Sequence, residues 1–281
     1  MKKIFTLIIS INIIGMMIGF ESEAKEISIT NNLIEKDRLE MIKEKGVLTV
    51  VAPSKETPFF SINPKTNEIS GIDSDIINEI TKRLGINKIE VKEEQFSNLL
   101  EKFNSDDSVD ISFGGMFITP ESEKLVDFTN PLYKETEAII VPKLSTLNFI
   151  SDLKNSVVGV EEGTIFKKLS EKWKENHLIK DILILNSTTE LFNALNNRKI
   201  DAALADSIII DYHLIKEKDP TLRILKGYTP ELQGVIGIAV KKNDTSLLNE
   251  LNKIIDDMKS DGTLYAILVK NGLGKNNMIG N

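Results

Sequence analysis

Short apolar stretches alternate with segments of helical periodicity along most of this chain. The run Val47–Ala52 is apolar and has the length of a buried strand. From residue 72 to residue 84, isoleucine or leucine recurs every fourth position, which places these side chains on one face of a helix that ends at Gly85. Residues 137–141 are short and rich in apolar side chains, and they also predict a buried strand. This alternation predicts an α/β fold rather than an all-α or all-β one.

The first 24 residues have the composition of a signal peptide. Lys2 and Lys3 precede an apolar run over residues 4–20, and the polar and small residues up to Ala24 suit cleavage. We therefore expect residues 1–24 to be removed and the protein to be periplasmic or secreted, with an uncleaved membrane anchor as the alternative. The chain contains no cysteine, which excludes a lipid anchor on a cysteine as well as disulfides.

Composition and motifs exclude several classes of function. The net charge of −7 argues against nucleic acid and anionic membranes as partners, since both call for basic patches. The two histidines, His177 and His213, have no second ligand at metal-binding spacing, so we expect no metal site. The chain has no nucleophile elbow, phosphate-binding loop or dinucleotide fingerprint, so we expect neither a cofactor nor catalysis.

Residues 114–130 read GGMFITPESEKLVDFTN. This segment resembles the pattern G-M-x-I-T-x-E-R-x-x-x-x-D-F-[ST] of the extracytoplasmic solute-binding proteins, family 3, which serve polar amino-acid ABC importers. Further segments resemble the family's other motifs in the same order, at residues 71–76, 152–173, 200–207 and 234–268. The resemblance covers residues 38–274, nearly the whole chain after the predicted signal peptide.

The resemblance implies a two-lobed fold of the type II periplasmic-binding-protein kind. Lobe 1 would be discontinuous, comprising residues 25–137 and 236–281, and lobe 2 would comprise residues 138–235. Two crossing hinge strands, near residues 134–142 and 234–240, would join them. Such a protein captures a small molecule by hinge closure and presents it to a membrane permease, and we expect it to act as a monomer.

The chain departs from the family at the residue that holds the ligand's carboxylate. The family's Arg grips the α-carboxylate through paired N–H donors, and Ser122 stands at that position. Phe117 replaces the hydroxyl residue that usually follows G-M. Half of the usual carboxylate chemistry is therefore missing.

Three further positions match residues that the family uses to bind the ligand. Asp206 falls where an acid pairs with the ligand's α-ammonium, although an acid at a strand end can instead cap the next helix. Gly163 and Thr164 form a strand-to-helix turn whose free N–H groups suit an anion, or they simply start the helix. Ile165 replaces the second hydroxyl that is usual there.

The remaining candidates form the walls of the expected cleft. Glu56 stands where the family has an aromatic residue, so with Asp206 it would supply a second acid, unless it points to solvent. The apolar and glycine candidates, which could equally belong to the core, are Phe59, Phe60, Gly114, Gly115, Met116 and Phe117.

Two kinds of ligand follow from this residue set. The ligand is an amino acid or short peptide whose carboxylate is held by backbone N–H groups, Ser122 or Lys124, or it is a cationic amine with no carboxylate. A free ligand sensor with the same fold is a further alternative. Cyclohexadienyl dehydratases use this fold as enzymes, but they also handle a carboxylate-bearing substrate, so the missing Arg argues against that function.

Overall fold

The computed structural model describes residues 37–215 and 221–279, so the predicted signal peptide lies outside the described residues. The α-helices are α1 (Arg38–Lys45), α2 (Ile72–Leu84), α3 (Leu99–Ser105), α4 (Ile165–Glu175), α5 (Thr188–Asn196), α6 (Ser207–Ile215), α7 (Thr245–Ser260) and α8 (Thr263–Lys270). The 3₁₀ helices are η1 (Phe96–Asn98), η2 (Ser122–Lys124), η3 (Ile150–Asn155) and η4 (Lys275–Asn277). The strands are β1 (Val47–Ala52), β2 (Lys55–Glu56), β3 (Phe60–Ile62), β4 (Ile69–Ser70), β5 (Lys88–Glu93), β6 (Ile111–Ser112), β7 (Asp127–Phe128), β8 (Tyr133–Pro142), β9 (Val157–Glu161), β10 (Asp181–Leu185), β11 (Ala202–Asp206), β12 (Leu222–Ile224), β13 (Gln233–Ile236) and β14 (Ala239–Val240).

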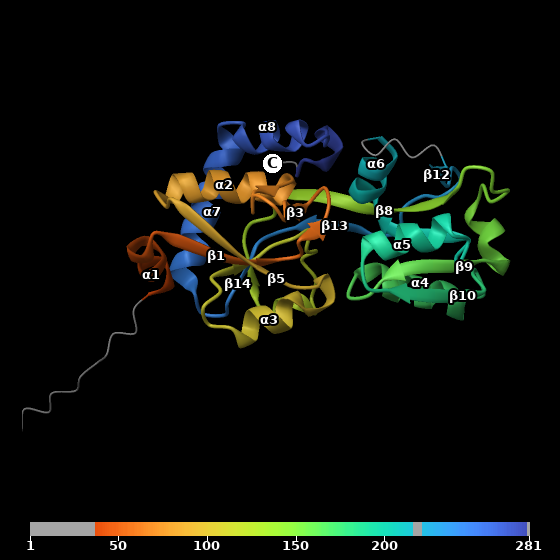
Figure 1. Cartoon of the computed structure of the whole chain (residues 1–281), viewed down its shortest axis with the longest axis horizontal. Coiled ribbons are helices and arrows are strands. Elements are labelled where there is room, and N and C mark those ends of the chain that lie inside the picture. Colours follow the sequence, from red (N-terminus) through yellow and green to blue (C-terminus); the bar gives the residue numbers. More distant parts are fainter. Residues whose placement is uncertain (1–36, 216–220, 280–281) are drawn as a thin grey trace, which may run out of the picture. The chain divides into compact units, whose positions relative to one another are not determined.

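The first sheet has the strand order β5-β1-β6-β14-β7, with β1 parallel to β5 and β6 and with β14 antiparallel to its neighbours. Helices α2 and α3 cover opposite faces of it (Figure 1). Successive side chains of a strand alternate between faces, so Val50 joins the core under α2 while Val51 packs with Leu99 and Phe103 of α3. The strand and the helix predicted from the sequence are both confirmed, and Gly85 ends α2 in the left-handed conformation, with φ of 71°.

The second sheet has the strand order β10-β9-β11-β8-β12. Strands β9, β10 and β11 run parallel to one another, whereas β8 is antiparallel to β11 and β12. Gly159 of β9 lets the sheet and its helices approach closely, because a Cβ atom there would lie 2.4 Å from Ile200 and 2.7 Å from Leu191 of α5. The parallel arrangement places the carboxyl ends of β9 and β11 at one edge of this sheet.

Strand β8 takes part in two separate pairings along its ten residues. Its first four residues pair with β13, whereas residues 137–142 pair with β11 and β12 of the second sheet. Strand β14, three residues after β13, belongs to the first sheet. These two segments are the crossing strands predicted from the sequence, and Figure 1 shows β8 as the long strand that leads from β13 towards β12. The exact boundaries of the two lobes stay a prediction.

Two local features of the structure are not evident from the local sequence. The segment after β1, which is rich in proline and polar turn residues, forms a small three-stranded antiparallel sheet of β2, β3 and β4, whose strands of two or three residues are too short to show a periodicity. Asp110 follows Asp106 and Asp107 in an acidic run, yet it is only 7% exposed. Its carboxylate accepts a hydrogen bond from the Thr49 amide at 2.8 Å and pairs with Arg38 at 3.3 Å, interactions between distant segments that the local sequence does not show.

Candidate ligand-binding site

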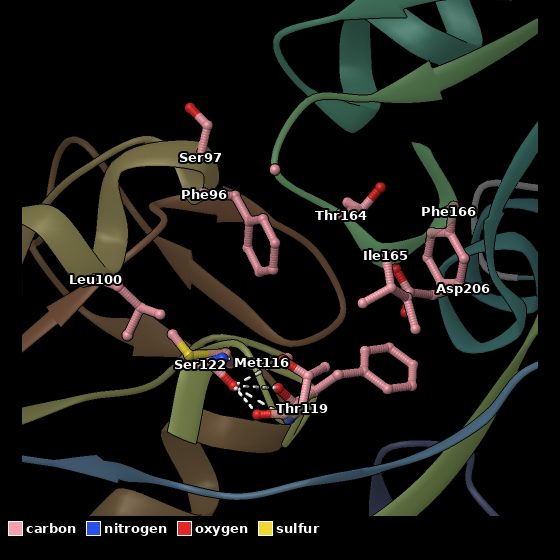
Figure 2. A pocket seen from close by; sticks show the side chains of 13 residues that line it. Phe96, Ser97, Leu100, Met116, Thr119, Ser122, Thr164, Ile165, Phe166 and Asp206 are labelled. Atoms are coloured by element: carbon pink, nitrogen blue, oxygen red, sulfur yellow. Dashed lines mark hydrogen bonds between the residues drawn. The ribbon is translucent and has the colours of Figure 1, made fainter. Parts of the chain in front are cut away.

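A cavity of about 140 Å³ lies where the ends of several elements converge (Figure 2). Its walls come from η1 and α3, from the 115–122 segment, from the β9–α4 turn and from the end of β11. The lining residues are Phe96, Ser97, Leu100, Gly115, Met116, Phe117, Thr119, Ser122, Gly163, Thr164, Ile165, Phe166 and Asp206. Segments more than 100 residues apart in the sequence therefore share one small space.

The cavity brings together eight of the twelve residues that the sequence predicted for the site. These are Gly115, Met116, Phe117, Ser122, Gly163, Thr164, Ile165 and Asp206. The lining residues that sequence reasoning missed are Phe96, Ser97, Leu100, Thr119 and Phe166. Thr119 could have been found, because it lies inside the recognised 114–130 segment. Phe96 and Ser97 could also have been found, because they follow β5, whose carboxyl end lies beside that of β1.

The other four predicted residues do not line this cavity. Phe59 and Phe60 are buried in the core, where Phe59 stacks on Tyr133 with ring centroids 6.4 Å apart. Gly114 packs against Pro53, which a Cβ atom would meet at 2.3 Å. The Glu56 carboxyl group lies elsewhere in the interior, within hydrogen-bond distance of Thr188 Oγ1. Phe59 and Phe60 stabilise the core through the apolar area that they remove from water.

A glycine turn in the cavity wall is held by a buried acid. The Gly115 amide, at φ of 69°, donates to Asp73 Oδ2 at 2.7 Å, and Tyr133 Oη donates to Asp73 Oδ1 at 2.8 Å. Asp73 is fully buried, and burial raises its pKa to about 7 in spite of these two donors. Asp73 lies in the first turn of α2, where an acid suits the helix dipole, and its carboxylate also fixes this glycine turn.

Ser122 cannot replace the family's Arg as a carboxylate anchor in this arrangement. Its hydroxyl oxygen accepts from the Thr119 amide at 3.1 Å and lies 3.1 Å from the Thr119 carbonyl oxygen, to which it can donate. Lys124, the other candidate anchor, is exposed and does not line the cavity. Phe117 packs edge-on against Phe166 with ring centroids 5.9 Å apart.

The amino end of α4 faces the cavity without a side-chain cap. Thr164 is its N-cap residue, but its hydroxyl donates to the Glu161 carbonyl at 2.8 Å instead of accepting from the helix. The first N–H groups of α4 and the positive end of its dipole are therefore directed towards the space that Gly163, Thr164 and Ile165 line. The amino end of a helix with free N–H groups can bind a carboxylate.

Two buried glutamates, both within the electrostatic influence of Asp206, meet at one hydroxyl group. Thr188 Oγ1 lies 2.7 Å from Glu56 Oε2 and 2.7 Å from Glu161 Oε2. Glu56 is 7% exposed, so the alternative that it points to solvent is wrong. Burial raises the pKa of Glu56 to about 7, and burial together with the charge of Glu56 raises the pKa of Glu161 to about 8. Since one hydroxyl carries one hydrogen, it can donate to only one of the two carboxyl groups at a time.

Asp206 is the last residue of β11 and lines the cavity. It is 8% exposed, and burial raises its pKa to about 6, against the opposing effect of the Glu135 side chain. No lysine, arginine or histidine occurs among the described residues that line the cavity. A carboxylate at this point, ionised at neutral pH, therefore has no basic side chain beside it in the cavity wall.

The described residues contain neither a helix able to cross a membrane nor a cluster of metal-binding side chains. None of the described helices combines the length and the apolar character that crossing a membrane requires. Within residues 37–215 and 221–279, no group of three or more histidine, aspartate or glutamate side chains is arranged to hold a metal ion.

Two mixed sheets, two crossing strands and a cavity at the strand ends define a type II periplasmic binding protein. The chain matches the model of bacterial extracellular solute-binding proteins, family 3, over residues 48–273, and it belongs to that family.

The chain is also similar to individual proteins. It is 31% identical to ABC transporter arginine-binding protein 1 of Escherichia coli (strain K12) over 213 residues, which cover 75% of this chain and 84% of that protein. It is 29% identical to the ABC transporter glutamine-binding protein GlnH of Bacillus subtilis (strain 168) over 279 residues, which cover 96% and 97% of the two chains. The structure of an ancestral arginine-binding protein bound to arginine matches with a TM-score of 0.73 and 28% identity, covering 81% of this chain and 98% of that one. The relatives are transporter binding proteins, and this chain is a binding protein rather than an enzyme.

Proposed function

We propose that this amino-acid-binding component of an ABC importer captures a solute with a cationic nitrogen, a basic amino acid being the first candidate. The observation that carries the proposal is Asp206 in the cavity wall with no basic side chain among the other lining residues. A charge-assisted bond from an ammonium would compensate the buried carboxylate. The apolar rings of Phe96, Phe117 and Phe166 would pack on the rest of the solute and can also face a cation.

Further support for a cationic solute comes from the two buried glutamates on which the charge of Asp206 acts. Glu56 and Glu161 are buried with Thr188 between them, and the charges of Glu56, Glu161 and Asp206 affect one another. A second cationic group on the solute, such as a guanidinium, would lower the electrostatic cost of ionising these glutamates. Of the relatives, the Escherichia coli protein is named for arginine, and the ancestral protein was crystallised with it.

The amino end of α4 supports an amino acid over a simple amine. A zwitterion placed between this helix and Asp206 would direct its carboxylate to the helix N–H groups and its ammonium to the acid. This arrangement would replace the missing Arg only in part, because a charge-assisted bond is worth roughly 1.5–3 kcal/mol, or about 10- to 100-fold in affinity.

A cationic amine without a carboxylate is the second candidate, and Ser122 favours it. The Ser122 hydroxyl bonds to the Thr119 backbone, so the position of the family's Arg has no donor left for a carboxylate. A solute that lacks a carboxylate would need no donor there. A free sensor that reports solute to another protein remains a third candidate for the same fold.

The remaining parts of the proposal follow from membership of the family. The chain would be exported and cleaved near Ala24, and it would work as a monomer. Closure of the two lobes about β8 and β13 would trap the solute, and the closed form would be recognised by a membrane permease.

A thermal-shift panel on the wild type and on Ser122→Arg distinguishes the two candidate solutes. The panel contains arginine, lysine, histidine, glutamine, glutamate, aspartate, putrescine and choline, because a bound ligand raises the melting temperature. We expect at least one basic amino acid or amine to stabilise the wild type more than either acidic amino acid does. The largest shift with glutamate or aspartate would refute a cationic solute.

Comparing the thermal shifts of Ser122→Arg with those of the wild type shows whether the solute is bound through a carboxylate. An amino-acid solute should bind the variant as well as or better than the wild type, because the guanidinium fork restores a bidentate partner. An amine should lose binding, because the new charge repels it and pairs with Asp206. Ser105→Arg, at an exposed position in α3, adds the same charge away from the cavity and serves as the control.

A further inference from the structure

Glu135 is a buried acid in the middle of the crossing strand β8. Side chains alternate along a strand, so Tyr133, Glu135 and Glu137 project from the same face of β8. Glu135 is 2% exposed and lies opposite Gly234 of β13. Neither solvent nor a side chain of the opposite β13 residue can therefore form a hydrogen bond with the Glu135 carboxyl group.

The neighbouring Glu137 shows how a buried carboxylate is normally stabilised here. Its oxygens accept hydrogen bonds from the Leu232 amide at 3.1 Å, from the Glu231 amide and from Tyr228 Oη. By contrast, neither oxygen of Glu135 accepts a hydrogen bond from a donor in the described part of the chain. Burying an ionised carboxylate without donors is very unfavourable, so Glu135 must carry its proton.

The acceptor for that proton is Asp206. Strands β8 and β11 are antiparallel with Asp206 opposite Glu137, so Glu135 is the diagonal neighbour of Asp206 on the same face of the sheet. Asp206 Oδ1 is likewise buried and receives no hydrogen bond from a described N–H or O–H group. A single proton held between the two side chains satisfies both groups.

We infer that Glu135 is a positioning residue of the ligand site, which keeps its proton and donates it in a hydrogen bond to Asp206, so that Asp206 stays ionised with its second oxygen available to the solute's ammonium. The role in ligand binding rests on the proposed function. The protonation of Glu135 and its bond to Asp206 do not, because they are argued from burial, from the missing donors and from the strand register.

The pKa shifts of the two acids agree with this division of roles. Burial and the adjacent Asp206 raise the pKa of Glu135 well above its usual range, whereas the bond with Glu135 lowers the pKa of Asp206. The other titratable groups that act on the pair are also acidic, or neutral at pH 7. They are Asp73 and Glu137, together with Tyr133, Glu56 and Glu161.

Carbon-13 NMR of the side-chain carboxyl groups tests the inference on ligand-free protein. Wild type, Glu135→Gln and Glu135→Leu are labelled at aspartate and glutamate carboxyl carbons and titrated from pH 4 to pH 9, with Asp206→Asn identifying the Asp206 signal. We expect the Glu135 signal to keep the chemical shift of a protonated acid at pH 7. The midpoint of Asp206 should rise by about one pH unit in Glu135→Leu, the equivalent of one lost charge-assisted bond. Glu135→Gln keeps a donor and should leave the midpoint close to that of the wild type.

Titration of Glu135 together with the exposed glutamates would overturn the inference, and this result needs only the wild type. Equal Asp206 midpoints in the Leu and Gln variants would overturn it as well. A calorimetric arm then uses arginine and putrescine as probes at pH 6. At pH 6 a midpoint one unit higher lowers the ionised fraction of Asp206 from about one half to about one tenth. Glu135→Leu should therefore lose about fivefold in affinity while Glu135→Gln retains it. If neither probe binds the wild type, the result counts against the proposed function, and the NMR titration still decides the role of Glu135.

Discussion

Replacing Glu161 with Gln should make the folded protein less sensitive to alkaline pH. Thr188 Oγ1 lies 2.7 Å from a carboxyl oxygen of both Glu161 and Glu56, and its single hydrogen can serve only one of them. The other acid must be protonated to make its contact favourable. A Gln at position 161 can donate through its amide group at any pH, so it mimics the protonated form of Glu161.

The direction of the effect follows from the raised pKa. Burial and Glu56 raise the pKa of Glu161 from 4.5 to about 8. Above pH 4.5 the unfolded chain loses this proton while the folded state retains it, so stability falls as the pH rises towards 8. The pKa of Glu56 is raised to about 7, so Glu56 also lowers the stability as the pH rises, over a lower pH range than Glu161 does.

The magnitude follows from the pH interval. Each pH unit over which only the folded state holds the proton changes the unfolding free energy by about 1.4 kcal/mol. Between pH 6 and pH 9 the Glu161 contribution should therefore fall by about 2–3 kcal/mol. For a protein of this size about 1 kcal/mol corresponds to roughly 2–4 °C in melting temperature. The wild type should lose roughly 4–12 °C more than the variant over this range.

Differential scanning calorimetry at pH 6, 7, 8 and 9 measures the effect. Protein is first dialysed in guanidinium chloride and refolded, because a bound solute would itself raise the melting temperature. Glu175→Gln, at an exposed position in α4, removes the same charge without affecting the buried pair and should follow the wild type. Parallel curves for wild type and Glu161→Gln would show that Glu161 is already ionised in the folded state, and the account of the Thr188 hydroxyl would be wrong.

Three other predictions concern the ligand and the crossing strands. Asp206→Asn should weaken a cationic solute more than tenfold in calorimetric titration while leaving the melting temperature of the ligand-free protein nearly unchanged, and equal affinities would remove Asp206 from the site. Small-angle scattering should show a smaller radius of gyration with saturating solute, and an unchanged radius would argue against an import role. Gly234→Ala should lower the melting temperature, because the added Cβ would lie 1.8 Å from the Phe117 ring, and an unchanged value would mean that Phe117 moves aside at little cost.

The fold class, the family and most of the predicted residues that line the cavity could be found from the sequence. Apolar runs and helical periodicity are local patterns, so the residues of β1 and α2 could be predicted from the sequence. The 114–130 segment and the strand-end position of Asp206 are also local signals, because glycine turns and strand ends direct side chains to one edge of a sheet. Eight of the twelve predicted site residues accordingly line the cavity.

The environment of each acid, by contrast, depends on contacts between distant segments of the chain. Glu56 and Thr188 are 132 positions apart, yet they meet at hydrogen-bond distance, and Glu135 reaches Asp206 only through the register of β8 against β11. Burial likewise placed Phe59 and Phe60 in the core rather than in the cavity. The protonation of a carboxyl group depends on how much water and how many donors surround it. Those surroundings come from segments far away in the chain, so no local pattern around an acid reveals whether it carries a charge.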